Sequence, residues 1–573
     1  MYKIKGELKL KKLLIAILSL VFALSLLCGC NPDAGGAEQP IDPLSAGGFV
    51  QNKIGDFSKY ENTSAYRKVS TPEEFLQAIV DAKYHYKNVW DEATSTYTQE
   101  PADGYTKDNF KGTVHVIEIE NDLNLGYYQL SETAKNIGKT ATESAIVSDY
   151  ASKYSNLRAW LTHSEMMLEN GISQIKVENT SDLLIYSKNG VKLTHCGFKV
   201  TSDNNVVFRN LEFDEMWQWE DAPTKDSGKI GDYDWYGWAY FKVAYCGYIW
   251  IDHCTFGKSY DGQIDYSNTN YTANKTVAAF APYGADGGNG LHISWCNFSA
   301  GSDDPDGYIY KMMSAIEEEY QEYKAGTVTE PNYLYYNALR DAGASFNDIL
   351  YGLAIPQKKA FLCGDSGGEN AYEYNLTLKI SFAHCTFKNI EDRIPKLRGG
   401  NAAMYNCVVD NTQYYTYRTR LRSLGAASAV SAVNSGWKCA LTSQGIVCGN
   451  GGSFYGENNI YRGIENLLKN NDSGNSPEKD GGYQLVNCSY DKTGTGTPFV
   501  GSSSDAGNKF SNSSSSILKP ENFSWHTPNG VQPFKIPDIG IEALEELEEY
   551  LATHNLGAGA NEGFEFSLLK SKY

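Results

Sequence analysis

Residues 249–256 read IWIDHCTF, in which apolar and polar side chains alternate and a Cys stands two positions before a Phe. Alternation with a period of two is typical of a β-strand with one buried face. The Cys–Phe spacing recurs in THCGF at 194–198, in LHISWCNF at 291–298 and in LKISFAHCTF at 378–387, while VVFRNLEF at 206–213 resembles a copy without the Cys. A strand that recurs in this way predicts a repetitive β-fold.

The spacing of the Cys residues suggests stacked coils. Cys385 and Cys407 are 22 residues apart, a plausible length for one coil of a solenoid, and Cys254 and Cys296 are 42 apart, close to two such steps. Equivalent positions of stacked coils lie above one another. We therefore predict a column of small, buried thiols along the axis, with disulfides between some of them as the alternative.

Composition and charge narrow the class of protein. The 573-residue chain is 41% hydrophobic and contains 54 Gly and 41 Tyr, a composition that favours turns and strands over a helical bundle. Its 50 Lys and Arg against 69 Asp and Glu give 50 − 69 = −19, which argues against nucleic acid as a partner. An acidic polysaccharide would need a local basic cluster or a bridging cation.

The amino terminus has the features of an export signal. Lys9, Lys11 and Lys12 precede an apolar run at 13–27, which is short for a membrane-spanning helix. The run ends in LCGC, which resembles a bacterial lipobox, so Cys30 is the expected lipid anchor; the alternative is an ordinary signal cleaved nearby. We expect a monomer on the extracellular side of a bacterial membrane, lipid-anchored or secreted, that contacts the membrane through the anchor only.

Helical signals lie outside the repeated strands. Thr71 and Pro72 have the pattern of an N-cap and a first helical residue, and residues 311–325 and 537–553 also predict helices. Residues 301–357 break the strand rhythm and are predicted as an insertion. The expected organisation is a signal peptide at 1–30, a flexible tether at 31–60, a β-helix domain at 61–560 and a tail at 561–573.

Asp261 and Asp265 form the first chemical constellation. They are four residues apart just after a strand, so both carboxylates share one face if the segment is extended. Paired carboxylates suit a hard cation such as Ca²⁺. Solvated acidic turn residues are the alternative.

The second constellation is basic. Residues 391–400 read EDRIPKLRGG, and residues 357–364, QKKAFLCG, precede them. Basic groups on successive turns of an acidic protein make a local anion site, and Arg can bind a carboxylate in bidentate fashion. Surface ion pairs with Glu391 or Asp392 are the alternative.

Four motifs in order resemble the signature of the pectate lyases of polysaccharide lyase family one. They are IWIDH at 249–253, DGQID at 261–265, Lys359 with Leu362 and Gly364, and RIPKLRGG at 393–400. The resemblance begins near Val69 and weakens over 301–357 and again between about 412 and 535. It implies an all-β fold: a right-handed parallel β-helix with a short N-terminal helix, an inserted helical segment and a C-terminal helix.

The resemblance also implies roles for single residues. Arg393 matches the base that removes the C5 proton of a galacturonate unit, and Lys359 and Arg398 match residues that hold substrate carboxylates. Asp261 and Asp265 match Ca²⁺ ligands. The implied reaction is β-elimination in pectate or a related polyuronate, which leaves 4,5-unsaturated oligogalacturonides.

One stretch departs from the family. Where the family has one or two further acidic ligands, this chain has Gly237 and Ala239 around a Trp. Asp232 and Asp234 lie nearby, and Asp234 is the candidate third ligand. Two alternatives therefore stay open: a non-catalytic β-helix surface lipoprotein that binds acidic glycans, and a metal-free lyase acting on methylated pectin. For His253 we expect a structural role, because its strand belongs to the scaffold.

Overall fold

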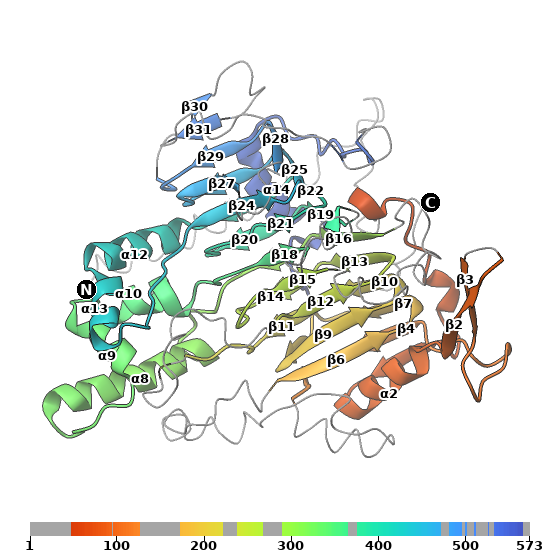
Figure 1. Ribbon diagram of the computed structural model, residues 1–573, viewed down its shortest axis with the longest axis horizontal. Coiled ribbons are helices and arrows are strands. Elements are labelled where there is room, and N and C mark those ends of the chain that lie inside the picture. The colour runs from red at the N-terminus through yellow and green to blue at the C-terminus, as the bar shows by residue number, and fades with distance from the viewer. Residues whose placement is uncertain are drawn as a thin grey trace, which may run out of the picture. The chain divides into compact units, whose positions relative to one another are not determined.

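Three parallel sheets form the body of the protein, and most coils of the chain contribute one strand to each sheet (Figure 1). The computed structural model describes residues 47–93, 96–126, 172–219, 221, 238–267, 289–364, 375–376, 378–470, 481–495, 499–500, 509–511, 525 and 532–564. The predicted signal peptide with Cys30, and Asp232, Asp234 and Gly237, lie outside these residues.

The strands follow one another in the same order in every coil. The ten-stranded sheet contains β1 (Tyr66–Val69), β4 (Val116–Ile119), β7 (Ser181–Tyr186), β10 (Asn204–Arg209), β13 (Tyr248–Asp252), β16 (Gly290–Ser294), β19 (Lys379–Ala383), β22 (Asn401–Tyr405), β25 (Ser453–Glu457) and β28 (Gly482–Val486). The eleven-stranded sheet contains β5 (Leu123–Asn124), β8 (Lys192–Thr194), β11 (Glu212–Asp214), β14 (Thr255–Phe256), β17 (Asn297–Phe298), β20 (Thr386–Lys388), β23 (Val408–Asp410), β26 (Ile460–Arg462), β29 (Ser489–Asp491), β31 (Lys509–Ser511) and the antiparallel β30 (Phe499–Val500). The eight-stranded sheet contains β6 (Ser173–Glu178), β9 (Cys196–Thr201), β12 (Phe241–Ala244), β15 (Ile264–Tyr266), β18 (Phe361–Cys363), β21 (Lys396–Arg398), β24 (Gln444–Gly449) and β27 (Asn466–Asn470). A separate hairpin pairs β2 (Tyr86–Asp91) with β3 (Thr96–Pro101). The predicted right-handed parallel β-helix is confirmed.

The repeated motif is the corner between the ten-stranded and eleven-stranded sheets. The residue before the Cys has a positive φ, 48° at His253, 50° at Trp295 and 54° at His384, and this left-handed residue turns the chain from one sheet into the next. Their rings stack along the axis, with centroids 5.8 Å apart between His253 and Trp295 and 4.6 Å apart between Trp295 and His384. The Cys that follows then points into the core.

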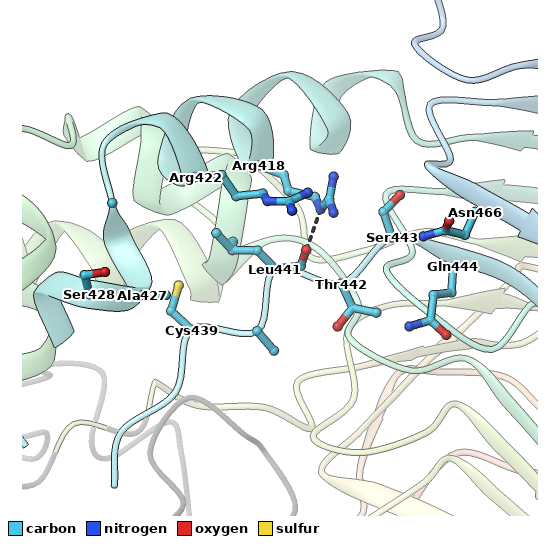
Figure 2. Close-up of a pocket in the computed structure, with 12 residues that line it drawn as sticks. Arg418, Arg422, Ala427, Ser428, Cys439, Leu441, Thr442, Ser443, Gln444 and Asn466 are labelled. Carbon is cyan, nitrogen blue, oxygen red and sulfur yellow. Dashed lines mark hydrogen bonds between the residues drawn. The ribbon is translucent and has the colours of Figure 1, made fainter. Parts of the chain in front are cut away.

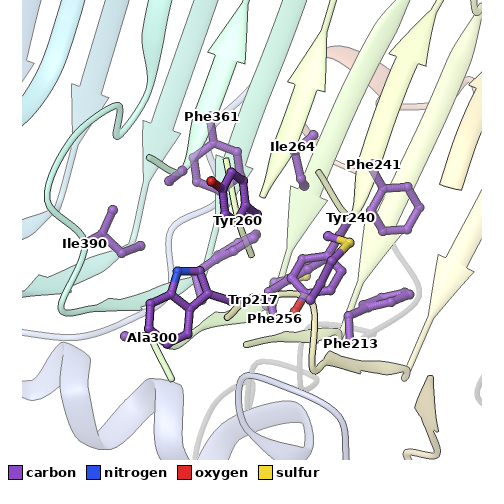
Figure 3. Close-up of a cluster of buried hydrophobic side chains, with 14 of the residues drawn as sticks. Phe213, Trp217, Tyr240, Phe241, Phe256, Tyr260, Ile264, Ala300, Phe361 and Ile390 are labelled. Atoms are coloured by element: carbon purple, nitrogen blue, oxygen red, sulfur yellow. The ribbon is translucent and has the colours of Figure 1, made fainter. Parts of the chain in front are cut away.

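Aromatic side chains fill the interior behind this corner. Phe256, Phe298 and Phe387 occupy paired positions on neighbouring coils, and their ring centroids lie 4.7 and 5.0 Å apart in parallel stacks. Phe361, from β18, meets Phe298 edge to face at 4.7 Å. Figure 3 shows part of this cluster, in which Phe256 and Phe361 lie among the rings of Tyr240, Tyr260 and Trp217.

The prediction of buried thiols is confirmed, with two corrections. All ten Cys among the described residues are free and buried, and the backbone N–H of Cys254 donates to Sγ of Cys296. Cys254 and Cys296 are therefore one coil apart and not two, because β13 pairs directly with β16 and the segment after β15 lengthens the coil. Cys196 does not belong to this column, since it starts a strand of the eight-stranded sheet.

The helices pack on the outside of the β-helix or are inserted in the turns between its strands. α2 (Pro72–Ala82) begins as predicted, with Thr71 Oγ1 accepting from the Glu74 amide, and the predicted insertion is helical. The remaining helices are η1 (Gly48–Val50), η2 (Ser58–Tyr60), α8 (Tyr308–Ala325), α9 (Leu334–Asp341), α10 (Phe346–Ile349), the π-turn η6 (Leu350–Ala354), α12 (Thr412–Ser423), α13 (Ala426–Val433), η10 (Leu544–Glu546), α14 (Leu547–Thr553) and η11 (His554–Leu556). None of the helices in the described part of the chain is long and apolar enough to cross a membrane.

The structure adds detail at three of the expected boundaries. Residues 47–60, expected in the tether, are folded: Phe49, for example, is buried against Phe534 at a centroid distance of 5.0 Å. Phe564, expected in the tail, is fully buried in a hydrophobic cluster with Trp250. The C-terminal helix begins at residue 544, well after 537, because the extended segment before it includes Gly540 with a φ of 69°.

Candidate active site

Three consecutive coils carry charged residues at the same turn, between the eleven-stranded and eight-stranded sheets. Asp261 lies between β14 and β15, Lys359 between β17 and β18, and Arg393 between β20 and β21. Because β15, β18 and β21 pair in order, these turns are stacked about one strand spacing, roughly 4.8 Å, apart. The three residues, up to 132 positions apart in sequence, thus meet on one edge of the β-helix.

Gln357 ties the three turns together. Its side chain is fully buried; Oε1 accepts from the Ser259 amide at 2.9 Å, and Nε2 donates to the Asp261 carbonyl at 2.8 Å and to the Lys359 carbonyl at 2.5 Å. Its own carbonyl accepts from the amide of Glu391 at 2.8 Å. One residue therefore fixes the backbone of all three turns: its side-chain amide bonds the turns of Asp261 and Lys359, and its main-chain carbonyl bonds the turn of Arg393.

The carboxylates of Asp261 and Asp265 lie in a field of cations. Lys359 Nζ donates to Asp261 Oδ1 at 2.7 Å, and both side chains are mostly buried. Asp265 projects from β15 between Lys242 and Leu362 on the neighbouring strands. Burial and the nearby charge of Asp261 raise the pKa of Asp265 to about 6, although Lys242, Arg393 and Lys359 oppose the shift.

Arg393 and Arg398 contribute the positive charge of the next coil. Arg393 has a φ of 66°, its amide donates to Asp392 Oδ1 at 2.7 Å, and its buried Nε has no hydrogen-bond partner. Lys396 lies between the two arginines in sequence, and burial together with their charges lowers the pKa of Lys396 to about 8. Gly399 follows with a φ of 94°, where a side chain would strike the Asn375 side chain, so the chain can turn there only with glycine.

The fit of a cation to this site rests on Asp265. Its buried Oδ1 has no hydrogen-bond partner, and Gly262 and Asp261 border it, so a hard cation would satisfy an oxygen that is otherwise unpaired. Within the described residues no group of three or more His, Cys, Asp or Glu could surround a metal ion. Ala239 is buried and supplies no ligand, and Asp234 lies outside the described residues, so the expected third ligand stays a prediction.

His253 has the structural position expected of it. It is fully buried, Nδ1 lies 2.7 Å from Asp252 Oδ2, and Nε2 lies 2.8 Å from the carbonyl of Asn555. Arg209 Nε donates to the same Asp252 oxygen at 2.7 Å. This buried network anchors the C-terminal segment to the β-helix on a sheet away from the charged turns.

Helices border the site because they arise from the same turn. The segment α8–η6 stands between β17 and β18, and α12 and α13, which the sequence analysis missed, stand between β23 and β24. The two groups pack on each other, for example through α12 and η6. Figure 1 shows the helices of both groups gathered beside one end of the strands.

A hollow of about 420 Å³ lies under α12 and α13 (Figure 2). Arg418 and Arg422 line it, but both donate to Glu465, at 2.5 and 3.0 Å, so their charges are paired. Gln444, at its edge, donates its amide to the Glu391 carbonyl at 2.8 Å, which places the hollow on the coil next to Arg393.

Three further residues near the site were not predicted from the sequence: Gln357, Lys242 and Lys396. Little in the sequence indicated a role for Gln357, because a glutamine followed by two lysines usually lies in solvent. For Lys242 a signal existed: IKV at 175–177, FKV at 198–200 and FKV at 241–243 repeat a lysine between two apolar residues.

The chain is similar to known pectate lyases in sequence and in fold. A family model described as Pectate lyase matches residues 341–471. Pectate lyase B of Paenibacillus amylolyticus is 31% identical over 354 residues, which cover 61% of this chain and 76% of that protein. A pectate trisaccharide-lyase of Thermotoga maritima is 24% identical over 233 residues, 41% of this chain and 40% of that protein. The solved structure of a pectate lyase from Paenibacillus sp. 0602 aligns with a TM-score of 0.65 and 27% identity, over 93% of this chain and 100% of the other.

Fold, charged turns and relatives together define a polysaccharide lyase built on a parallel β-helix. The chain belongs to the pectate lyase family.

Replacing Gln357 by Met should keep the side-chain volume but remove the side-chain amide bonds to the turns of Asp261 and Lys359, while the main-chain bond to Glu391 remains. We expect a loss of about 2–4 kcal/mol in the free energy of unfolding, from carbonyl and amide groups left unpaired. We also expect kcat to fall at least about tenfold at temperatures where the variant is folded, because small displacements of catalytic groups are costly.

Denaturant unfolding and initial rates on polygalacturonate, with near-ultraviolet circular dichroism to confirm the fold, measure both effects. Gln321→Met, on the exposed face of α8, is the control and should change stability by less than about 0.5 kcal/mol. A folded Gln357→Met protein with the rate of the parent would show that Gln357 does not position the site.

Proposed function

We propose that this pectate lyase cleaves polygalacturonate by β-elimination, with Arg393 as the base and Lys359 and Arg398 as ligands of substrate carboxylates. The observation that carries the proposal is the stacking of Asp261, Lys359 and Arg393 on three consecutive turns, held together by Gln357. Such stacking fixes the basic side chains of Lys359 and Arg393 on neighbouring turns of an otherwise acidic protein, and a polyuronate needs basic groups of this kind to bind.

The reaction needs a base and a stabilised carboxylate. Arg393, which can accept a proton only as the neutral guanidine, takes the proton as the C5–H bond breaks; the electron pair forms the C4–C5 double bond, and the C4–O bond breaks. The departing glycosidic oxygen takes up a proton, so one new non-reducing end carries a 4,5-unsaturated uronate. Lys359 and Arg398 would pair with uronate carboxylates and stabilise the negative charge that develops beside C5. Burial of Lys359 strengthens such a contact, because water screens it less.

We further propose that the reaction depends on Ca²⁺. Asp261 and Asp265 would hold the ion, helped by Asp234 if that residue lies close enough. A bound Ca²⁺ neutralises a uronate carboxylate and acidifies the adjacent C–H bond. The unpaired, buried Oδ1 of Asp265 supports this assignment, whereas the contact of Lys359 with Asp261 would have to loosen.

Removal of divalent cations should abolish turnover and Ca²⁺ should restore it. In Asp265→Asn, which keeps the shape of the side chain but loses its charge, the Ca²⁺ concentration for half-maximal rate should rise at least about tenfold. The assay follows the ultraviolet absorbance of the unsaturated product, and Asp108→Asn, on an exposed loop, is the control. Full activity in excess chelator would instead favour a metal-free reaction in which Lys242 and Lys359 neutralise the substrate.

Replacement of Arg393 tests the base. Arg393→Ala should lower kcat by about 10²–10⁴, the usual contribution of a general base, with little change in the unfolding midpoint. Arg393→Lys should keep the positive charge but alter the pH dependence of kcat, because an amine loses its proton more easily than a guanidinium. Arg67→Lys, half-exposed on β1, should leave rate and pH profile unchanged. A pH profile that is the same in Arg393→Lys and the parent would rule out Arg393 as the base.

The location of the enzyme is also a proposal. We propose that Cys30 becomes lipid-modified after export, so that the enzyme acts on the extracellular side of the membrane. Cys30→Ala should move the protein from the membrane fraction to the soluble fraction of cells that express the full chain. Equal membrane association of both proteins would contradict a lipid anchor at this residue.

A further inference from the structure

Lys258 is buried beneath the turn that carries Asp261. It lies between β14 and β15, three positions before Asp261, and is 3% exposed. Its carbonyl accepts from the Tyr240 hydroxyl at 2.9 Å, so its backbone is attached to the segment just before β12. A charged side chain loses its hydration when it is buried, and this loss costs free energy unless other groups contact the charge. The contacts of Lys258 therefore indicate what the residue does.

The ammonium group of Lys258 binds the end of the helical insertion. Nζ donates to the carbonyls of Leu353 at 3.1 Å, Ala354 at 2.5 Å and Pro356 at 2.7 Å. Leu353 and Ala354 are the last two residues of η6, and carbonyl groups at the end of a helix have no partner within it. An ammonium group has three N–H donors, so these three carbonyls use all of them.

An indole ring covers another side of the ammonium group. Nζ of Lys258 lies 4.0 Å from the ring centroid of Trp217, which is 1% exposed and is labelled in Figure 3. Contact with the face of an indole stabilises a desolvated cation. Trp217 packs edge to face on Trp219 at a centroid distance of 6.4 Å, and Trp219 packs in the same manner on Tyr336 of α9 at 6.1 Å. The cation thus lies between the end of the insertion and a group of rings that leads to α9.

These contacts join the two segments that carry Asp261 and Lys359. Pro356 directly precedes Gln357, and Lys359 follows three positions after Pro356. Gln357 fixes this segment through its side-chain amide, and Lys258 fixes it one residue earlier, where the insertion ends. The 2.7 Å contact of Lys359 Nζ with Asp261 Oδ1 requires both segments to keep their relative positions.

The charge of Lys258, and not its bulk, is needed for this connection. A methionine has a similar length and would fill the space without the cost of burying an ammonium group. It has no N–H group to donate to carbonyl oxygens, so packing alone would then fix the end of the insertion.

We propose that Lys258 is a positioning residue for the lyase reaction. Its ammonium group fixes the end of the helical insertion on the turn of Asp261 and so sets the position of Lys359 relative to Asp261. This proposal rests on the proposed function, in which Asp261 binds Ca²⁺ and Lys359 binds a substrate carboxylate. Lys258 itself is buried beneath the turn and acts through Lys359. The insertion is then part of the structure that places the charged groups.

Replacement of Lys258 by Met tests this role. Lys258→Met keeps the length of the side chain but leaves three carbonyls without a donor. At temperatures where the variant is folded, kcat on polygalacturonate should fall at least about tenfold, because small displacements of catalytic groups are costly. Lys311→Met, on the exposed face of α8, removes the same charge from the same insertion and should keep the kcat of the parent. Circular dichroism and the unfolding midpoint define the temperatures at which each variant is folded.

A double-mutant cycle separates positioning from stability. If Lys258 acts through Lys359, Lys258→Met should lower kcat less than about twofold in the Lys359→Gln background, because the group that it positions is already lost. An equal fall in both backgrounds would show that Lys258 acts independently of Lys359, which overturns the proposal. A folded Lys258→Met protein with the kcat of the parent also overturns it.

Lys258→Gln provides the test if Lys258→Met does not fold. The glutamine amide keeps two N–H donors for the carbonyls but is shorter and uncharged, so the fold should be retained. We expect kcat to fall at least about threefold, because the end of the insertion shifts. The kcat of the parent in this variant would contradict a positioning role.

The outcomes separate the positioning role from the proposed function. A parent that turns over polygalacturonate, with the same kcat in the Lys258 variants, overturns the positioning role and leaves the proposed function intact. If the parent shows no turnover, the proposed function fails, and hydrogen exchange of the backbone amides at 259–265 still decides the positioning role. The Gln263 amide donates to the Ala360 carbonyl at 2.8 Å, so it reports the contact between the two segments. Faster exchange in Lys258→Met than in Lys311→Met supports the role, and equal exchange overturns it.

Discussion

Hydrogen bonding between successive coils in fixed register is the constraint on which this structure depends. Parallel pairing places each residue directly over its equivalent in the next coil. Every column along the axis must therefore consist of side chains that can pack on one another. Inward columns satisfy this with stacked rings, such as Phe256 over Phe298, and with thiols whose sulfur accepts from the next backbone. At the corners, the stacked residues are His and Trp, whose backbone has the left-handed conformation.

The same constraint assembles the candidate active site. Asp261, Lys359 and Arg393 are far apart in sequence, yet register stacks their turns, and no long-range loop packing is needed to bring them together. Turns alone would leave these groups loosely held. Gln357 removes that freedom from inside, since its buried amide binds the backbone of two of these turns and its carbonyl binds the third. Groups mounted in this way keep their positions before substrate arrives, as electrostatic stabilisation requires.

The sequence predicted those features of the structure that depend on local patterns of residues. Alternation and the Cys–Phe spacing indicated stacked strands, Thr71 and Pro72 indicated the first helix, and ordered motifs indicated Asp261, Lys359 and Arg393. The sequence did not reveal the lengths of the coils, because strands can pair in register whatever the length of the turns between them. For this reason Cys254 and Cys296 were predicted to be two coils apart, although they are one coil apart. Nor did it reveal that residues 47–60 are folded, since a short segment that lies on a larger surface needs no periodicity of its own.

The helical insertion illustrates how register and turn length are independent. Asn297 and Thr386 are 89 residues apart and Cys385 and Cys407 only 22, yet both pairs are neighbours on adjacent coils. A turn can therefore gain a whole group of helices without displacing a single strand. For evolution this means that the helices beside the charged turns can be rebuilt, exchanged or lost while the turns beneath them keep their positions.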